Sequence, residues 1–339
     1  MRFYIELVKE KKALLRHCYS EKIQFSDEEF SKIILVDAAF IIKVLLTFYF
    51  REENDNDHIF IKPWMIYDVW LEMILLEDQL MFFILEDLYD PDIIMVQSSK
   101  HDERPSIIHL SHHYLKHGKY SLKGTKDHNL EVIRHSRIEH FVDLLRYLYI
   151  PSEKADARPL ETVKAPSMIE LQQTGIKFKV GSSKNLFDIQ FNNGNLDIPR
   201  VNVGPILVLA IRNIITFEKH HYRADRYMND YVVLMSRLVM TLEDLDLMVT
   251  YGLIEKRSRI SATHIQNFSR EAIFYPTRFY FAHLCEDLNA YCEAPWHKWK
   301  VTLKQNYFDT PWAIISFIAA VILLLLTLIQ AVSSVISIT

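Results

Sequence analysis

The chain has 339 residues, of which 50% are hydrophobic and 24% are charged, and it contains only 7 Gly and 11 Pro. This composition excludes a largely disordered or collagen-like chain, and the scarcity of helix-breaking residues favours α-helix. With 39 Lys and Arg against 43 Asp and Glu, the net charge of −4 provides no overall positive field, so we expect no nucleic acid partner. Three scattered cysteines exclude a disulfide framework.

The first two predicted elements are helices. Residues 2–19 mix apolar and charged side chains at helical spacing, which predicts an amphipathic helix. Ser26 and Glu29 have the spacing of a capping box, in which each side chain accepts a hydrogen bond from the other residue's backbone amide. The helix that follows, to about Phe50, is apolar nearly all round, so we expect it deep in the core.

The next apolar segment, residues 67–89, carries the adjacent carboxylates Glu77 and Asp78 with no basic partner in the segment. On a continuous helix Glu77 would lie among apolar side chains, where an unpaired carboxylate has a raised pKa, as a catalytic acid needs. Alternatively the helix breaks here and Asp78 caps a second helix that begins at Gln79. We favour the structural interpretation, because buried carboxylates are usually satisfied by hydrogen bonds.

A His-rich stretch lies at residues 97–130. Within it His109, His113 and His117 would share one face of a helix, which makes them candidate metal ligands. A metal-assisted hydrolase that uses some of His109, His112, His113 and His117 with a distant carboxylate such as Glu77 or Asp78 is the enzymatic alternative. The surrounding polar residues favour a loop, and no carboxylate stands at zinc-protease spacing, so we expect no metal or other cofactor and find no catalytic motif.

At residues 176–203 the spacing of the hydrophobic residues changes from a helical pattern to alternation with polar residues. Before it, residues 133–149 and a short segment closed by Gly175 have helical spacing. Alternating apolar and polar residues with an Asn193-Gly194 turn then predict a small β-meander. Helical spacing resumes after Gly204 and includes a helix capped by Thr241 and closed by Gly252. We therefore predict a mainly α fold with a small β-meander at about 176–203, forming one helical globular body over residues 1–308.

The last segment, 311–338, is predicted to be a transmembrane helix. No residue from Trp312 to Ile329 is charged, and a helix of that length spans roughly 27 Å, close to the hydrocarbon thickness of a bilayer. The side chains expected to contact lipid are Trp312, Ala313, Ile314, Ile315, Phe317, Ile318, Val321, Leu324, Leu325, Leu328 and Ile329. A helix buried within an oligomer is the alternative interpretation.

The charges beside this segment predict its orientation. Lys298, Lys300 and Lys304 precede it, and residues 332–339 contain neither Lys nor Arg. By the positive-inside rule, the helical body then lies in the cytosol, at the plasma membrane or an endomembrane.

Five blocks of the sequence, in order, resemble the plant domain of unknown function 247 family. They are residues 18–46, 68–89, 140–149, 170–201 and 307–332. The resemblance implies a plant membrane protein with a C-terminal membrane helix and no assigned enzymatic activity, some relatives being associated with self-incompatibility recognition in grass pollen. The family pattern also has Asn and Pro at the positions of Asp78 and Met81, and it begins with a further segment; from the resemblance we expect Met1 to lie after that segment.

The predicted function is therefore that of a single-pass, C-terminally anchored plant membrane protein whose body acts in protein recognition or signalling. The expected partners are the lipid bilayer and a protein that the sequence does not identify. Neither the oligomeric state nor a ligand follows from the residues.

Overall fold

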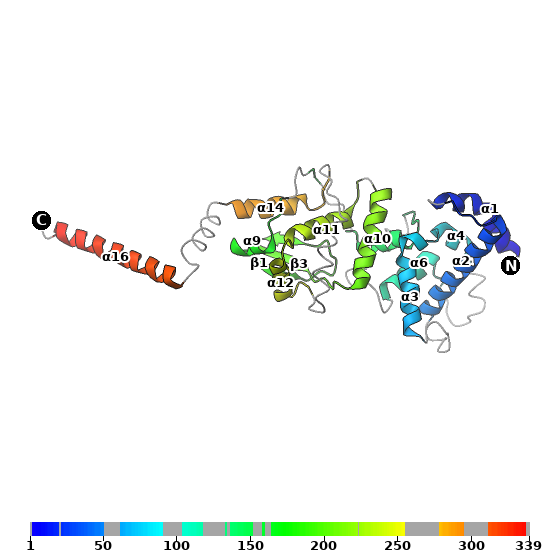
Figure 1. The fold of residues 1–339 in the computed structure, drawn as a ribbon, viewed down its shortest axis with the longest axis horizontal. Helices are drawn as coiled ribbons and strands as arrows, with labels where there is room; N and C mark the ends of the chain where they lie inside the picture. The colour runs from blue at the N-terminus through cyan, green and yellow to red at the C-terminus, as the bar shows by residue number, and fades with distance from the viewer. Residues whose placement is uncertain are drawn as a thin grey trace.

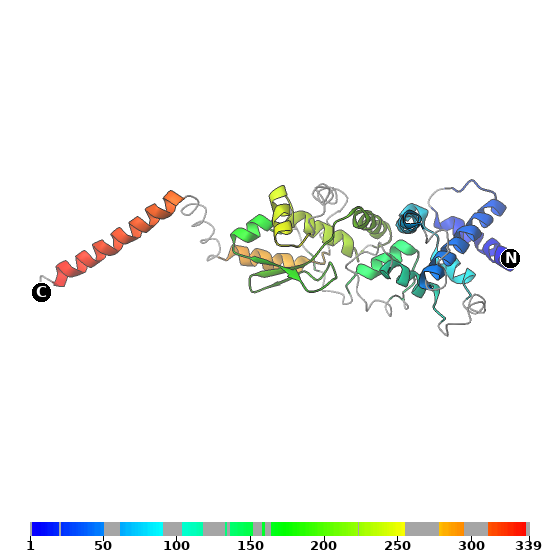
Figure 2. The ribbon, with the colours of Figure 1, turned by 90° about the horizontal axis from the view of Figure 1, so that it is seen from below.

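The computed structural model of the protein describes residues 2–19, 22–50, 62–90, 104–117, 133, 136–151, 158–159, 164–222, 224–254, 278–294 and 311–336. The molecule is elongated, with two groups of elements side by side and the C-terminal helix extending away from them (Figures 1 and 2). The predicted fold class is confirmed: the protein is mainly helical, with one small sheet and one long apolar helix at the C-terminal end.

The first group of elements is helical. It consists of α1 (Arg2–Cys18), α2 (Asp27–Tyr49), α3 (Pro63–Ile74), the 3-10 helix η2 (Leu76–Asp78), α4 (Phe82–Leu88), α6 (Ile107–His117) and α8 (Phe141–Tyr149). α2 begins at the predicted capping box, in which Ser26 accepts a hydrogen bond from the Glu29 amide and Glu29 accepts one from the Ser26 amide. α1, α4 and α6 pack against α2, around buried side chains such as Trp70 and Phe82.

α2 is less buried than its sequence predicts. Its inner face is buried, but Ile33, Val36 and Phe40 on the outer face are 38%, 66% and 41% exposed. The expectation of a helix buried all round is therefore wrong for this face, because the neighbouring helices pack against only part of the circumference of α2.

The helix break near residue 75 is present, but Asp78 does not cap the next helix. α3 ends at Ile74 and α4 begins only at Phe82, after Met81, which makes no side-chain capping bond. Glu77 and Asp78 lie on η2 and are both exposed. The prediction of Asp78 as a cap is thus wrong, because the chain remains extended through Gln79 and Met81 before it turns into α4.

The described part of the expected His-rich loop contains a helix, α6. The hydroxyl of Ser106 accepts a hydrogen bond from the His109 amide at the helix start. Ile107, Leu110 and Tyr114, at helical spacing, are buried where α6 packs against α2. The loop prediction depended on the polar character of this segment. The helix forms nonetheless, because packing of its apolar face against the rest of the fold stabilises it. His101 and His128 lie outside the described residues.

The second group contains the sheet. The strands are β1 (Lys177–Gly181), β2 (Gln190–Asn192) and β3 (Asn195–Pro199), in the order β1-β3-β2. β2 and β3 form the expected antiparallel hairpin, whose turn residues Asn193 and Gly194 have φ of 49° and 76°. β1, however, pairs in parallel with β3, so the sheet is not a meander. β2 therefore lies at the far edge, and the chain between β1 and β2 places Phe187 in an aromatic cluster with Tyr231 and Phe281.

The second group also contains helices. They are α9 (Met168–Gln173), α10 (Pro205–His221), α11 (Tyr227–Leu238), α12 (Leu242–Thr250) and α14 (Ala282–Glu293). Gly175 follows α9 and Gly252 follows α12, both with positive φ as predicted, and Thr241 caps α12 in a capping box with Asp244. α10 contacts α3 and α8 on one side and α11 on the other, so it joins the two groups of elements (Figure 1).

Candidate functional site

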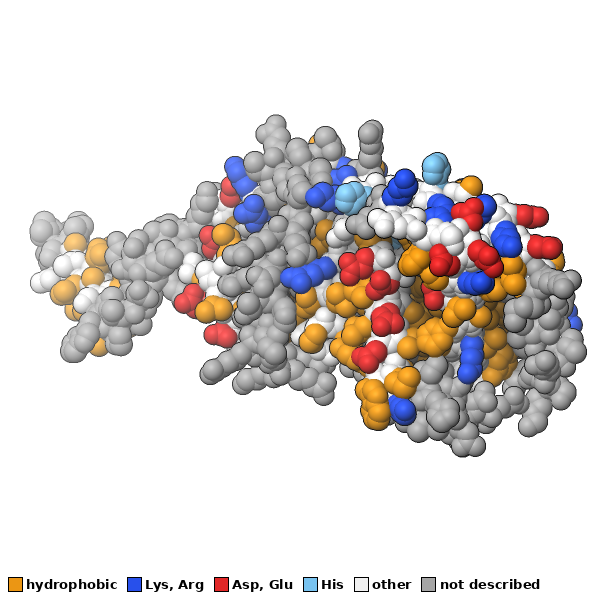
Figure 3. Space-filling view, turned by 45° about the vertical axis from the view of Figure 1, so that its right-hand side comes forward, with side chains coloured by type: hydrophobic (Ala, Val, Ile, Leu, Met, Phe, Trp, Pro, Cys, Tyr) orange, Lys and Arg blue, Asp and Glu red, His pale blue; other side chains and the backbone are white. Residues whose placement is uncertain are grey.

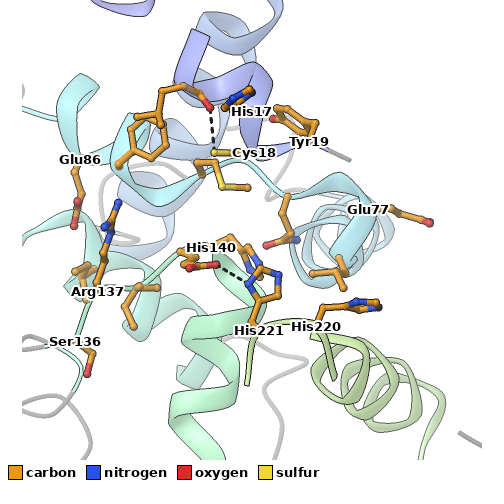
Figure 4. A pocket seen from close by; sticks show the side chains of 18 residues that line it. His17, Cys18, Tyr19, Glu77, Glu86, Ser136, Arg137, His140, His220 and His221 are labelled. Carbon is orange, nitrogen blue, oxygen red and sulfur yellow. Dashed lines mark hydrogen bonds and ion pairs between the residues drawn. The ribbon is translucent and has the colours of Figure 1, made fainter. Parts of the chain in front are cut away.

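A cavity of about 720 Å³ opens among the N-terminal helices, next to the end of α10 (Figure 4). Its walls come from the C-terminal end of α1, the η2–α4 turn, residues 136–140 and the last residues of α10. Its polar lining consists of His17, Cys18, Tyr19, Glu77, Gln79, Glu86, Ser136, Arg137, Glu139, His140, His220 and His221. Apolar side chains such as Leu14, Met81 and Phe83 complete the wall, so the cavity offers both polar and apolar contacts.

Gln79 fixes the wall formed by the η2–α4 turn. Its buried side-chain amide donates hydrogen bonds to the carbonyls of Met73, at 3.0 Å, and Leu75. Its Oε1 accepts one from the Val142 amide of α8 at 3.2 Å. Because the end of α3 and the start of α8 otherwise leave backbone groups without partners, one side chain satisfies both helix ends.

Residues 136–140 form the opposite wall. The Glu139 carbonyl accepts a hydrogen bond from the Phe82 amide at 2.8 Å, which ties this segment to the first turn of α4. The Glu139 carboxylate lies 3.2 Å from Nδ1 of His221, at the end of α10 (Figure 4). Both side chains are about half exposed, so we attribute little stability to this pair.

His140 caps α8 beside the cavity. Its Nδ1 accepts a hydrogen bond from the Asp143 amide at 3.3 Å. Burial, assisted by nearby His221, lowers the pKa of His140 to about 4. The ring is therefore neutral at pH 7, and because Nδ1 is the acceptor, the proton resides on Nε2.

Below the cavity, a buried polar network connects α8 to α10. Asp143 accepts hydrogen bonds from the Glu139 amide and from the hydroxyl of Tyr222. The guanidinium of Arg146 lies 3.7 Å from the centroid of the Tyr222 ring and pairs with Glu218. This network fixes the helices that carry His140 and His221.

The cavity is better suited to binding than to covalent chemistry. Its one thiol, Cys18, has a pKa raised by burial and by the negative charge of Glu139, so it is protonated at neutral pH and a poor nucleophile. Around it lie hydrogen-bond donors and acceptors of both charges, including Arg137, Glu86 and Glu139. Such a lining can orient a polar ligand by hydrogen bonds.

The carboxylates singled out in the sequence are not the centre of this cavity. Glu77 contributes to its rim, but its carboxylate points away from the cavity (Figure 4), and Asp78 does not line it. Both residues are exposed, so the buried environment expected for a catalytic acid is not formed.

The histidines of α6 are packing residues in this structure. The ring of His113 contacts that of His117 in a tilted arrangement, with centroids 4.7 Å apart, and that of Tyr49 edge-to-face at 4.9 Å; His109 also contacts Tyr49. Burial lowers the pKa of His113. Among the described residues, no three His, Cys, Asp or Glu side chains are placed to hold a metal ion.

The sequence interpretation missed Gln79, Glu139, His140, Arg146 and Glu218. Only His140 carried a local signal, because it directly precedes the apolar period of residues 141–149 where an N-cap is needed. The others act through partners distant in the chain.

The C-terminal helix α16 (Pro311–Ile336) is separate from both groups of elements (Figure 1). Residues 315–333 are long and apolar enough to cross a membrane, and none of that span is buried. Side chains from Ile315 to Val332 expected to contact lipid are exposed; those of Trp312, Ala313 and Ile314 are not described. Lys298, Lys300 and Lys304 also lie outside the described residues.

A mainly helical body with a small mixed sheet and an apolar C-terminal helix defines the class of this protein. Residues 1–326 match the model of the plant proteins of unknown function designated DUF247, and the chain belongs to that family. The family description assigns no catalytic activity.

Two relatives from Arabidopsis thaliana support this assignment. UPF0481 protein At3g47200 is 23% identical over 358 residues, covering 95% of this chain and 71% of the relative. Putative UPF0481 protein At3g02645 is 25% identical over 182 residues, covering 52% of this chain and 34% of the relative. No solved structure matches the chain.

Proposed function

We propose that this protein is a single-pass membrane protein, anchored by α16, whose helical body acts in recognition on the cytosolic side. The observation that carries the proposal is the exposure of α16. Leu323, Leu324 and Ile329 are 62%, 66% and 60% exposed, although an apolar helix of this length is stable only when lipid or protein covers it.

The recognition role is supported by the open cavity beside the α8 cap. A cavity of this size holds a small molecule or several side chains of a partner. Its protonated thiol and its mixture of donors and acceptors favour binding over catalysis. Recognition of a protein by the body accounts for both features, the cavity and the membrane anchor.

Alkaline carbonate extraction of plant-cell membranes tests the anchor. We expect the full chain to remain in the pellet, and the double variant L324R/L325R to be extracted. Each Arg at the centre of a span costs about 2.5–3.5 kcal/mol on the insertion scale. The matched control V332R/S333R carries the same charges near the helix end, where the cost is smaller, and should stay in the membrane. Complete extraction of the wild-type chain would contradict the anchor.

Protease treatment of sealed vesicles tests the orientation. With the body in the cytosol, added protease degrades it in right-side-out microsomes and leaves only a fragment that contains α16. A protected body with a digested tail would reverse the proposed topology.

A further inference from the structure

A groove lies between the outer faces of α2 and α3, on the other side of η2 from the cavity. Its volume is about 460 Å³, and Tyr19, Glu77 and Gln79 line both hollows. Phe40 and Ile41 of α2 form one wall, and Val69 of α3 lies opposite. We call this hollow the α2–α3 groove.

The apolar surface of the groove continues onto the exposed face of α2. Ile33, Val36 and Phe40 are spaced three and four residues apart, so they form one stripe along the helix. Within the groove, the buried side chains of Met73 and Leu80 extend this surface inward. An apolar stripe that enters a groove has the form of a surface onto which a partner helix packs.

The charge of the groove restricts the partner. Asp37, Glu72, Glu77 and Asp78 line it, and no Lys, Arg or His is among its lining residues. Of the described residues, none forms an ion pair with any of these four carboxylates, whereas the nearby Asp27 and Asp87 are paired with lysines of α1. Burial raises the pKa of Asp37, and no neighbouring cation offsets this effect.

Figure 3 shows this combination at the surface: acidic side chains lie among exposed hydrophobic ones over the N-terminal helices. Four carboxylates around one groove create a negative potential that repels nucleic acid and anionic lipid head groups and attracts cations. Only a partner that carries both apolar and basic side chains can pack on the apolar stripe and pair with the carboxylates at the same time.

We propose that the α2–α3 groove binds a basic amphipathic helix of a partner protein. The apolar face of that helix packs on Phe40, Val36 and the groove floor. Its Lys or Arg side chains pair with Asp37 and with the carboxylates of α3 and η2. This inference rests on the recognition half of the proposed function and is independent of the membrane anchor.

A peptide-binding experiment tests the groove. The full chain is placed in nanodiscs of neutral phosphatidylcholine, so that the lipid itself does not attract cations. The probe is a fluorescent helical peptide with Leu at helical spacing and Lys elsewhere, and its partner has Glu in place of every Lys. We expect fluorescence anisotropy to show binding of the Lys peptide, weakened by salt, and no binding of the Glu peptide.

Two matched triple variants locate the interaction. E72Q/E77Q/D78N removes three of the four groove carboxylates and leaves Asp37, and we expect it to weaken binding of the Lys peptide about tenfold or more, equivalent to about 1.4 kcal/mol. E243Q/D246N/E286Q removes as many exposed carboxylates from α12 and α14 and should change the affinity less than about twofold. Thermal unfolding confirms that both variants remain folded. A photo-crosslinking residue at Phe40, but not at the exposed Leu242, should capture the peptide.

Equal weakening by both triple variants, equal binding of the two peptides, or failure of the Lys peptide to bind would overturn the groove as the docking site. None of these results affects the anchor, because carbonate extraction tests it separately.

Discussion

Arg146 and Glu218 form an ion pair that solvent does not reach. The Nε and Oε1 atoms are 3.0 Å apart, and the two side chains are 2% and 0% exposed. Glu218 also accepts hydrogen bonds from the amides of Met228 and Asn229, and Arg146 donates to the carbonyl of Asp225. The pair therefore joins α8, α10 and the start of α11 at one buried point.

Removing one charge of this pair should lower the free energy of unfolding more than removing both. In E218Q the Arg146 guanidinium remains buried without a counter-charge, and we expect the free energy of unfolding to fall by about 3–5 kcal/mol. In R146M/E218Q neither charge of the pair remains, and the introduced side-chain carboxamide can still accept a hydrogen bond from a backbone amide, so part of this loss should be recovered. Urea unfolding of the wild type, both single variants and the double variant measures the coupling; additive losses would contradict it.

Asp230 should make stability depend on pH around neutrality. It lies on α11, 5% exposed, and accepts hydrogen bonds from the Tyr280 amide and the Asn229 side chain. Burial outweighs these bonds and raises the pKa of Asp230 from its ordinary 3.8 to about 7. Between these values the folded chain holds a proton that the unfolded chain releases, so stability falls as pH rises from about 4 to about 7.

The substitution D230N removes this titration. We expect D230N to gain stability relative to wild type on going from pH 5 to pH 8, by about 2–3 kcal/mol, because about two pH units of this interval lie below the raised pKa. Paired thermal melts at both pH values give the difference. As a control, the same pair of melts is recorded for D246N, which removes a carboxylate from an exposed position of α12. A constant difference between D230N and wild type would contradict the raised pKa.

His140 should give stability a pH dependence opposite to that of Asp230, with stability lost as the pH becomes acidic. Its pKa falls from 6.5 to about 4 in the folded chain, mainly through burial. Between these values the unfolded chain binds a proton that the folded chain excludes, so stability is lost as pH falls from 6.5 towards 4. Buried His112, whose pKa burial also lowers to about 4, adds to the same loss.

Asn is a good N-cap that does not titrate, so H140N should keep α8 capped and reduce the acid-side slope. H140A also removes the titration, so it should be about 1 kcal/mol less stable than H140N at every pH, because the cap is absent. Urea midpoints at pH 4.5 and 6.5 separate the two effects, with the exposed His220 replaced by Asn as a control. If H140N keeps the wild-type slope, another group is responsible.

The features that could be predicted from the sequence are those fixed within a few residues. The capping boxes at Ser26 and Thr241, the glycines at 175 and 252 and the Asn193-Gly194 turn all formed as expected. Each depends on a local backbone geometry that only a few residue types satisfy. The long apolar C-terminal helix is also visible in the sequence, because its length and composition suffice to predict it.

The features that depend on distant partners could not be predicted. α6 is a helix because its apolar face packs on α2, and β1 pairs with β3 instead of β2, while Phe187, between β1 and β2, lies against the ring of Tyr231. Glu77 and Asp78 were candidate site residues because of their charge, yet the neighbouring Gln79 holds the cavity wall in place by its hydrogen bonds. Nothing in its local sequence indicates that its amide reaches both α3 and α8.

Gln79 gives the sharpest test of this architecture. Q79L keeps nearly the same volume but leaves the Val142 amide and the carbonyls of Met73 and Leu75 without their side-chain partner. An unsatisfied buried group costs about 1–3 kcal/mol, so we expect Q79L to lose at least about 2 kcal/mol of unfolding free energy. Q79E can still accept from Val142, but its carboxylate would face two carbonyls, so its loss should be larger at pH 8 than at pH 5.

The neighbouring exposed Glu77 provides the control, because E77L should change stability by no more than about 0.5 kcal/mol. Urea unfolding followed by tryptophan fluorescence measures all three variants, since Trp70 is buried on α3. An equal effect of Q79L and E77L would show that the hydrogen bonds of Gln79 do not hold α3 against α8. The cavity wall would then depend on apolar packing of Leu80 and Phe82 alone.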